Sequence, residues 1–185
     1  MLKIDGMLFE AKIGLINISN VEASLKKASL TLSGKNEFFQ IISLKPIASL
    51  KQLELAAEHT LYAFQNSQNF ALKPSMEFLL RAAAEKQLNK VLDAFPLTEG
   101  ENKVAVIALA ENKKNLIKAL KFAQSGLDFK ENPALLEENL KQNTDFLIDW
   151  FKIYSKELES LNSENKQEAL QKIILEKIAL LNLLD

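Results

Sequence analysis

The sequence predicts an α+β fold, in which a small mixed β-sheet is packed among many helices and the C-terminal third is helical. Three observations lead to this prediction. Residues 104–110, VAVIALA, form an apolar run bounded by polar residues, which is typical of a central strand covered on both faces. A turn-favouring Asp5-Gly6 pair separates two short extended segments near the N-terminus. Most of the remaining chain places apolar residues three and four positions apart, which is the helical period.

The composition indicates one globular domain over residues 1–185, with a helical C-terminal part over 132–185. Apolar residues make up 48% of the chain and charged residues 25%. There is no cysteine, which excludes disulfides and thiolate metal sites and fits a reducing compartment. No segment resembles a secretory signal or reaches the ~20 apolar residues of a membrane helix, so we expect a cytoplasmic protein without membrane contact. The formal net charge is −1, so any contact with nucleic acid must come from a local patch.

The first fifty residues are expected to contain a hairpin, a helix and a strand. The hairpin would pair Leu2–Ile4 with Leu8–Ile18. Asn20 can cap a short helix over Val21–Leu32. The segment Phe38–Leu44 is short, aromatic and β-branched, which favours a buried strand.

The middle of the chain contains its clearest helical pattern. A helix is expected over Ala48–Gln65, followed by a polar linker, NSQNFALKPS. The segment Pro74–Phe95 then has a proline and Ser75 at its start and an acidic residue, Glu77, in its first turn. Its apolar residues form one broad stripe, so we expect one continuous amphipathic helix.

The last part of the chain is predicted to be largely helical. After a turn at Thr98–Asn102 and the strand Val104–Ala110, a helix is expected over Asn112–Ser125. That helix would direct Leu116, Ile117, Leu120 and Ala123 toward the core and Lys114, Lys118 and Lys121 away from it. One or two helices are expected over Pro133–Leu161. Asn162-Ser163 then begins a final helix that is apolar over more than one stripe, and such a helix is either enclosed or docks onto another surface.

Arg81 is the only arginine in the chain, which has 22 lysines. A guanidinium can bind a carboxylate or a phosphate at two points, and an ammonium cannot. Two interpretations are open. Arg81 forms an intrahelical pair with Glu77 or Glu85, each four residues away, or it faces a ligand.

The residues that could support catalysis are few. His59 is the only histidine, and it lies within a predicted helix between Glu58 and Thr60. The five glycines do not form a phosphate-binding loop, and there is no nucleophile motif. The acidic pairs Glu137-Glu138 and Glu157-x-Glu159 lack further ligands at helical spacing, so no metal site is expected. The sequence therefore favours a protein that is not an enzyme, with no cofactor and no small-molecule substrate.

One segment resembles a known family. The sequence MEFLLRAAAEKQLNKVLDAF, followed by a turn and the strand VAVIAL, is similar to the signature of the small subunit of the KEOPS complex, the family of the p53-related-kinase-binding protein. The archaeal pattern, E-I-L-L-R-A-S-G-x-R-Q-I-x-x-A-I, fits Glu77 to Leu92 in register. The C-terminal ILEKIALLNL, Ile174 to Leu183, is similar to the family's closing helix. The match is weak over the first forty residues and over Pro133 to Asn165, where this chain is longer than compact archaeal members.

Two departures from the family pattern concern the predicted helix over 74–95. Ala84 stands where the family has glycine, and alanine is the better helix former by ~1 kcal/mol, which favours an unbroken helix. Lys86 stands where the family has arginine; the charge is kept and the two-point grip is lost.

The resemblance implies a non-catalytic accessory subunit of KEOPS, the complex that makes the threonylcarbamoyl modification on adenosine in tRNA. Such a subunit binds the kinase-like ATPase subunit and helps hold the acceptor end of the tRNA. For the protein partner, the over-apolar final helix suggests Leu175, Ile178, Leu181 and Leu184. For tRNA, the basic and amide side chains suggest Arg81, Lys86, Gln87, Asn89 and Lys90. The alternatives are an adaptor that binds a kinase-like partner without RNA contact, and a small enzyme that uses His59 as a base.

Overall fold

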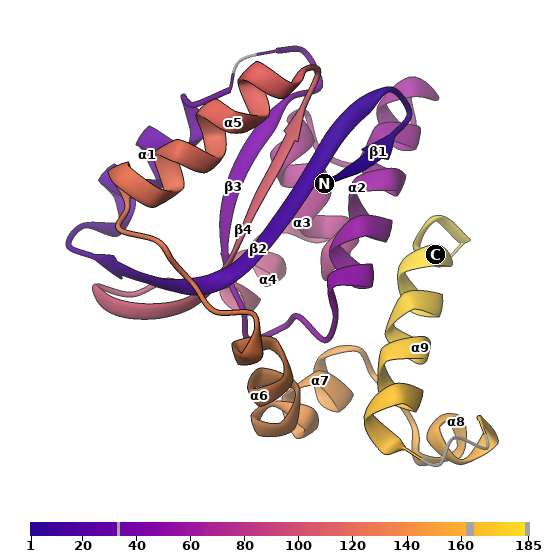
Figure 1. Ribbon diagram of the computed structural model, residues 1–185. Helices are drawn as coiled ribbons and strands as arrows, with labels where there is room; N and C mark the ends of the chain where they lie inside the picture. The colour runs from indigo at the N-terminus through magenta and orange to yellow at the C-terminus, as the bar shows by residue number, and fades with distance from the viewer. Residues whose placement is uncertain (33, 162–164, 184–185) are drawn as a thin grey trace.

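The computed structural model describes residues 1–32, 34–161 and 165–183 and has an α+β fold (Figure 1). The predicted hairpin is confirmed, because Asp5 and Gly6 both have positive φ and form the tight turn between its strands. Four strands are hydrogen-bonded in the order β1-β2-β4-β3, and a fifth short strand pairs with β2. The strands are β1 (Leu2–Ile4), β2 (Met7–Ile18), β3 (Phe38–Ser43), β4 (Gly100–Ala110) and β5 (Lys130–Glu131).

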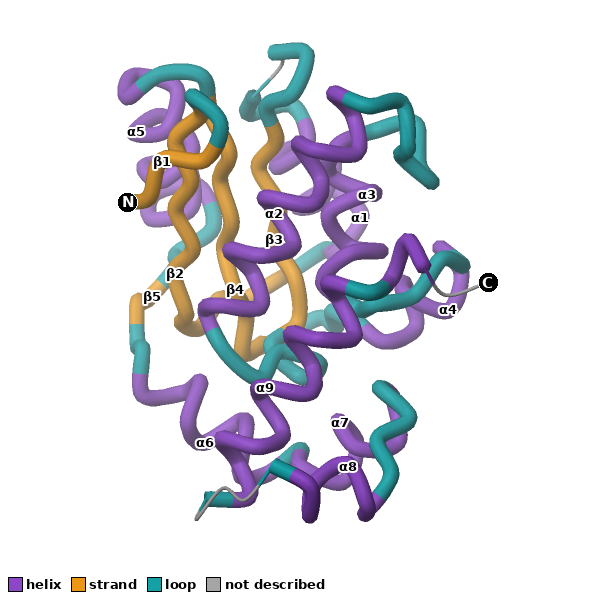
Figure 2. Tube along the Cα trace, turned by 90° about the vertical axis from the view of Figure 1, so that its right-hand side faces the viewer, coloured by secondary structure: helices purple, strands orange, loops and turns teal. Residues whose placement is uncertain are grey.

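Each strand pair that the structure describes is antiparallel, so the expectation of a mixed sheet is wrong. The reason lies in the chain between β3 and β4. Helices α2 (Leu50–Gln65) and α3 (Pro74–Ala82) pack against each other as a helical hairpin and bring the chain back to the end of the sheet at which β3 finished (Figures 1 and 2). A strand that starts from that end must run antiparallel to β3.

Helices cover both faces of the sheet. One face carries α2, α3 and α4 (Leu88–Ala94), and the other carries α1 (Val21–Ser29), α5 (Lys113–Lys121) and a π-helical turn at Phe122–Gly126 (Figure 1). The central strand β4 shows the consequence. Its residues 104–110 have no exposed surface, and successive side chains enter the two opposite cores. The prediction of a strand covered on both faces is confirmed.

The C-terminal part adds a third core at the end of the sheet. The prediction of one or two helices over Pro133–Leu161 is wrong, because the described chain there forms three helices with turns at Asn143 and Lys152. The final helix α9 then packs along α2 (Figure 1). These elements are α6 (Ala134–Gln142), α7 (Thr144–Trp150), α8 (Ser155–Ser160), α9 (Lys166–Ala179) and a 3₁₀ turn at Leu181–Leu183.

Other expectations need smaller corrections. Helix α1 is capped by Asn20 as predicted, but it ends at Ser29 rather than Leu32. In α5 the side chains of Leu116 and Ala119 enter the core, whereas Ile117 is 42% exposed. The predicted restart at Asn162-Ser163 lies outside the described residues.

The segment over 74–95 is not one helix. Helix α3 ends at Ala82, and α4 begins only at Leu88. Between them Ala84 has φ +48°, the left-handed conformation usual for glycine at the end of a helix. The amide of Glu85 donates to the carbonyl of Leu80 at 3.1 Å, which closes the helix end.

Tertiary contacts explain why alanine does not prevent this break. The side-chain amide of Gln52 donates to the carbonyl of Ala82 at 2.8 Å, and the indole of Trp150 donates to the carbonyl of Ala83 at 3.0 Å. A continuous helix would use these carbonyls internally, so the indole of Trp150 would lose its acceptor and Gln52 would keep only the carbonyl of Pro46. The helix therefore ends at the position where the family pattern has glycine. Ala84 stands there instead, and its Cβ makes the left-handed conformation less stable than it would be for glycine.

The Ala84→Gly variant should consequently be more stable than the wild type, by about 0.5–1 kcal/mol. Removing the Cβ relieves a left-handed strain of roughly 1–2 kcal/mol, and the greater freedom of glycine in the unfolded chain offsets about 0.4–1 kcal/mol of that gain. Urea unfolding measures the difference. Ala83→Gly is the matched control, because Ala83 has φ −91° and should lose stability on the same change. A destabilised Ala84→Gly variant would contradict the assigned conformation.

Candidate nucleic-acid interface

Arg81 is completely buried, although it lies on the polar side of its helix. Its Nε donates to Oε1 of Glu77 at 2.8 Å, and one terminal nitrogen lies 2.7 Å from the same oxygen. That nitrogen, Nη2, also donates to the carbonyl of Gln68 at 3.3 Å, and the other terminal nitrogen, Nη1, donates to the side-chain oxygen of Asn182. The pair with Glu77 is thus the interpretation that agrees with the structure. A direct contact between Arg81 and RNA is not available in this arrangement, because the guanidinium is enclosed and bonded on all sides.

The carboxylate of Glu77 is equally well bonded. Its second oxygen accepts hydrogen bonds from the amides of Phe70 and Ala71, at 2.7 and 2.8 Å. The ring of Phe70 lies against the guanidinium of Arg81, 4.6 Å from its central carbon to the ring centroid. One ion pair therefore joins three segments: the linker at 66–73, helix α3 and the C-terminal 3₁₀ turn.

The other four residues predicted for RNA lie together at the start of α4. Gln87, Asn89 and Lys90 are exposed, and Lys86 is half-buried. We call Lys86, Gln87, Asn89 and Lys90 the α4 surface. The carboxylate of Glu85 shapes it, because its Oε1 accepts from the amides of Lys86 and Gln87 and its Oε2 lies 3.6 Å from Nζ of Lys90.

Phe70 adds an aromatic ring to this surface. It is 41% exposed, and Nζ of Lys86 lies over its ring at 5.5 Å from the centroid. An exposed ring beside basic and amide side chains is the combination that binds unpaired bases and their phosphates. Sequence reasoning missed Phe70; the one available signal was an aromatic residue within an otherwise polar linker.

A cavity of about 360 Å³ adjoins the α4 surface. It lies between the α3–α4 junction and the end of α7, and residues of both segments line it. Three lysines border the cavity: Lys90, Lys152 and Lys177. Lys177 is held by Glu157 at 3.0 Å, whereas Lys152 forms no ion pair with a described residue. Lys152 and Lys177 thus give the α4 surface two basic neighbours that are distant in the sequence.

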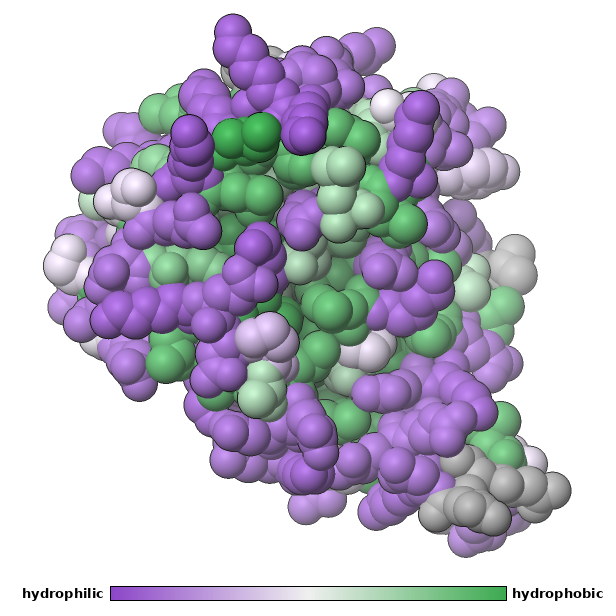
Figure 3. Space-filling view, in the orientation of Figure 1, coloured by the Kyte–Doolittle hydropathy of each residue, from purple (hydrophilic) through white to green (hydrophobic). Residues whose placement is uncertain are grey.

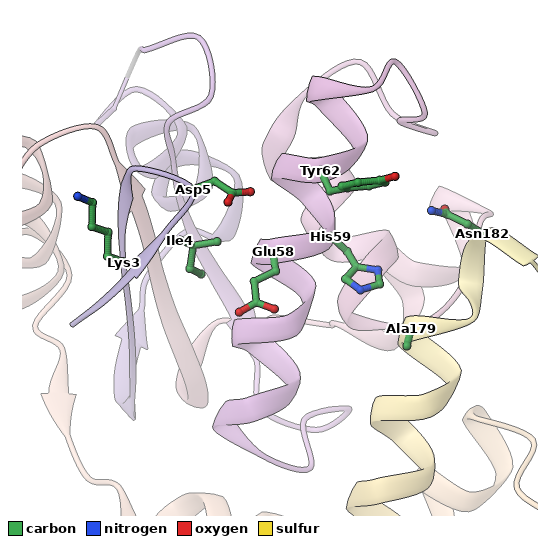
Figure 4. A pocket seen from close by; sticks show the side chains of 8 residues that line it. All are labelled: Lys3, Ile4, Asp5, Glu58, His59, Tyr62, Ala179 and Asn182. Atoms are coloured by element: carbon green, nitrogen blue, oxygen red, sulfur yellow. The ribbon is translucent and has the colours of Figure 1, made fainter.

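A second cavity, of about 640 Å³, surrounds His59 (Figure 4). His59 and Tyr62 project into it from α2, and Asp5 and Asn182 face them from the hairpin turn and the C-terminal turn. Burial lowers the pKa of His59, and the charge of Arg81 lowers that pKa further. No described residue forms a hydrogen bond with the imidazole, so nothing in that part of the chain orients it as a general base.

The predicted partner surface on the final helix needs correction. Ile178, on α9, is completely buried in the third core, and Leu181, in the 3₁₀ turn that follows α9, is 2% exposed. Leu175 is half-buried, and Leu184 lies outside the described residues. Of the four, only Leu175 is seen to reach the surface. Apolar side chains reach the surface elsewhere, in a band through the middle of the face seen in Figure 3.

Across 1–32, 34–161 and 165–183, no group of three or more histidine, aspartate or glutamate side chains is placed to hold a metal ion. None of the helices described there is long and apolar enough to span a membrane.

Comparison with known proteins places the chain in a family. The model of the family described as kinase binding protein CGI-121 matches residues 16–182. No curated protein matches the chain. The family description names a binding role rather than a reaction, in agreement with the interpretation of the chain as a non-enzyme. It also confirms the resemblance to the small KEOPS subunit. With a match over most of its length, this chain belongs to the CGI-121 family of kinase binding proteins.

Proposed function

We propose that this single-domain protein is a non-catalytic accessory subunit of the KEOPS complex. In this role it binds the kinase-like ATPase subunit and helps to recruit the 3′ acceptor end of tRNA for threonylcarbamoyladenosine modification. Membership of the kinase-binding family supports the protein partner. The α4 surface, with Phe70 beside Lys86, is the observation that supports the RNA contact.

The RNA contact is assigned to the four residues of the α4 surface and no longer to Arg81. Lys86 and Lys90 supply positive charge for phosphates, and Gln87 and Asn89 supply amides for sugar or base edges. Arg81 contributes indirectly, because its ion pair with Glu77 holds the linker that carries Phe70. Of the four residues that the sequence suggests for the protein partner, Leu175 is the one assigned to this contact, because it is half-buried on α9 and so reaches the surface.

Replacing Lys86 and Lys90 together by glutamine should weaken tRNA binding and reduce its salt dependence. Each lost phosphate contact is expected to lower the slope of log affinity against log salt by about 1, so the double variant should lose about 2. Fluorescence anisotropy with intact tRNA and with tRNA lacking its terminal CCA measures both quantities. Binding should need the CCA end.

The matched control is Lys141→Gln with Lys156→Gln, two exposed lysines on α6 and α8 that change the net charge equally. Unchanged tRNA binding by the Lys86/Lys90 variant would remove the α4 surface from the RNA contact. Absence of binding even at low salt would leave the second candidate function, an adaptor for the kinase-like partner without RNA contact. Family membership favours that alternative equally.

A further inference from the structure

Helices α1 and α5 concentrate positive charge on one side of the molecule. Both pack on the same face of the sheet, on the side away from α2 and α3, and contribute to one core (Figure 1). Together they contain six lysines and one glutamate, so they carry a net charge of +5 in a chain whose net charge is −1. All six lysines are exposed; they are Lys26, Lys27, Lys113, Lys114, Lys118 and Lys121, and we call them the α1–α5 face.

These lysines are not neutralised by neighbouring acids. None of the six forms an ion pair with a described residue. The nearby carboxylate of Glu37 is buried and already accepts from the amides of Gly34 and Glu111 and from the side chain of Asn115. Their positive charge is therefore presented to solvent.

Several exposed lysines of other helices are paired with an acid on their own helix. Lys141 pairs with Glu137 at 2.6 Å, and Lys172 pairs with Glu168 at 2.7 Å, each one turn away on its own helix. Such pairs are the usual arrangement on a solvated helix. Helix α5 has no acidic residue at all and places Lys114, Lys118 and Lys121 on successive turns, over roughly 10 Å of its axis. Lys156 on α8 and Lys166 on α9 also form no ion pair with a described residue, but each is a single lysine. The α1–α5 face differs because it gathers six such lysines around a helix without acids.

We propose that the α1–α5 face binds the phosphate backbone of RNA, at a contact separate from the α4 surface. This assignment rests on the proposed function for the choice of RNA as the polyanion. The composition of the face supports a backbone contact, since lysine ammonium groups bind phosphates as point charges. It argues against the core of a protein interface, where lysine is depleted and aromatic residues and arginine are enriched. The two helices themselves contain no aromatic residue and no arginine.

The test uses a blunt-ended RNA duplex, which has no single-stranded 3′ end for the α4 surface. Wild-type protein should bind it weakly at low salt, with an affinity that falls steeply as salt rises. The variant Lys114→Gln/Lys118→Gln/Lys121→Gln should bind more weakly, and the slope of log affinity against log salt should fall by about 2–3. The matched control, Lys141→Gln/Lys156→Gln/Lys172→Gln, removes the same charge from other helices and should bind as the wild type does.

Three results would overturn the proposal: duplex binding that the α5 variant retains, equal loss in both triple variants, or loss of kinase-like partner binding with RNA binding intact. The last result would identify the face as a protein interface. A negative result for the α1–α5 face can be told apart from a negative result for the proposed function. The Lys86/Lys90 variant tests the CCA end, which the duplex lacks, so either contact can be absent while the other is present.

Discussion

Replacing Arg81 by methionine is expected to lower the free energy of unfolding by about 3–5 kcal/mol. Methionine fills much of the same space, so the main change is the loss of the positive charge beside Glu77. The carboxylate would then remain buried with two amide donors and no counter-charge, and removing one partner of a buried pair has a cost of that size. Urea unfolding followed by circular dichroism measures the difference.

A double-mutant cycle separates the pair from its surroundings. The variant Glu77→Gln/Arg81→Met should be less destabilised than the sum of the single changes, because neither charge is then left alone. Lys90→Met is the matched surface control. Its ion pair with Glu85, at 3.6 Å, is solvent-exposed and should contribute no more than ~1 kcal/mol. A stable Arg81→Met protein that has lost RNA binding would instead restore the ligand-facing interpretation.

Arg81 shows where sequence reasoning reaches its limit. The spacing offered Glu77 or Glu85 as the partner, and the structure has Glu77, but the apolar stripe places Arg81 on the polar side of its helix. That face is covered by the linker at 66–73 and by Asn182, which lies 101 residues further along the chain. A single sequence holds no signal for such a long-range contact. On an exposed helix this ion pair would contribute a few tenths of a kcal/mol. Because it is buried, removing one partner leaves an uncompensated charge inside the protein, which costs far more.

The strands and helix starts were predictable because their signals are local. The run at 104–110 is short and apolar at every position, which is typical of a strand covered on both faces. Asn20, at the start of α1, bonds an amide of the first turn through its own side chain. The break at Ala84 was not predictable in this way. Intrinsic preference favours helix there, and the donors that override it, on Gln52 and Trp150, come from distant segments.

The apolar character of α9 was correctly seen to allow two outcomes, enclosure or docking onto another surface. The structure gives enclosure for Leu170, Ile173, Ile174 and Ile178, which enter the third core. Two of the residues predicted for a protein partner, Ile178 and Leu181, are therefore buried within this protein instead. Apolar surface and apolar core have the same pattern in a helix that is covered on more than one side.

Replacing Ile178 by alanine should accordingly destabilise the protein by about 2–5 kcal/mol, because the side chain is fully buried and a cavity would remain. For a chain of this size the melting temperature should fall by roughly 2–4 °C for each kcal/mol. Leu175→Ala is the matched change on the same helix. Leu175 is half-buried, so the loss of stability should be about 1 kcal/mol or less.

The same two variants distinguish a core role from a partner role. Binding to the kinase-like subunit, measured by calorimetry below the melting transition, should be weakened by Leu175→Ala and left unchanged by Ile178→Ala in the folded fraction. An Ile178→Ala protein that keeps its stability and loses the partner would show that α9 leaves its place on α2 when the partner binds. A Leu175→Ala protein with unaltered binding would direct the search to other apolar surface, including Leu2 and Leu50, which line one hollow beside the start of α2. Stability and partner binding must therefore be measured on each variant. A variant that is partly unfolded binds the partner less well even when its binding surface is unchanged.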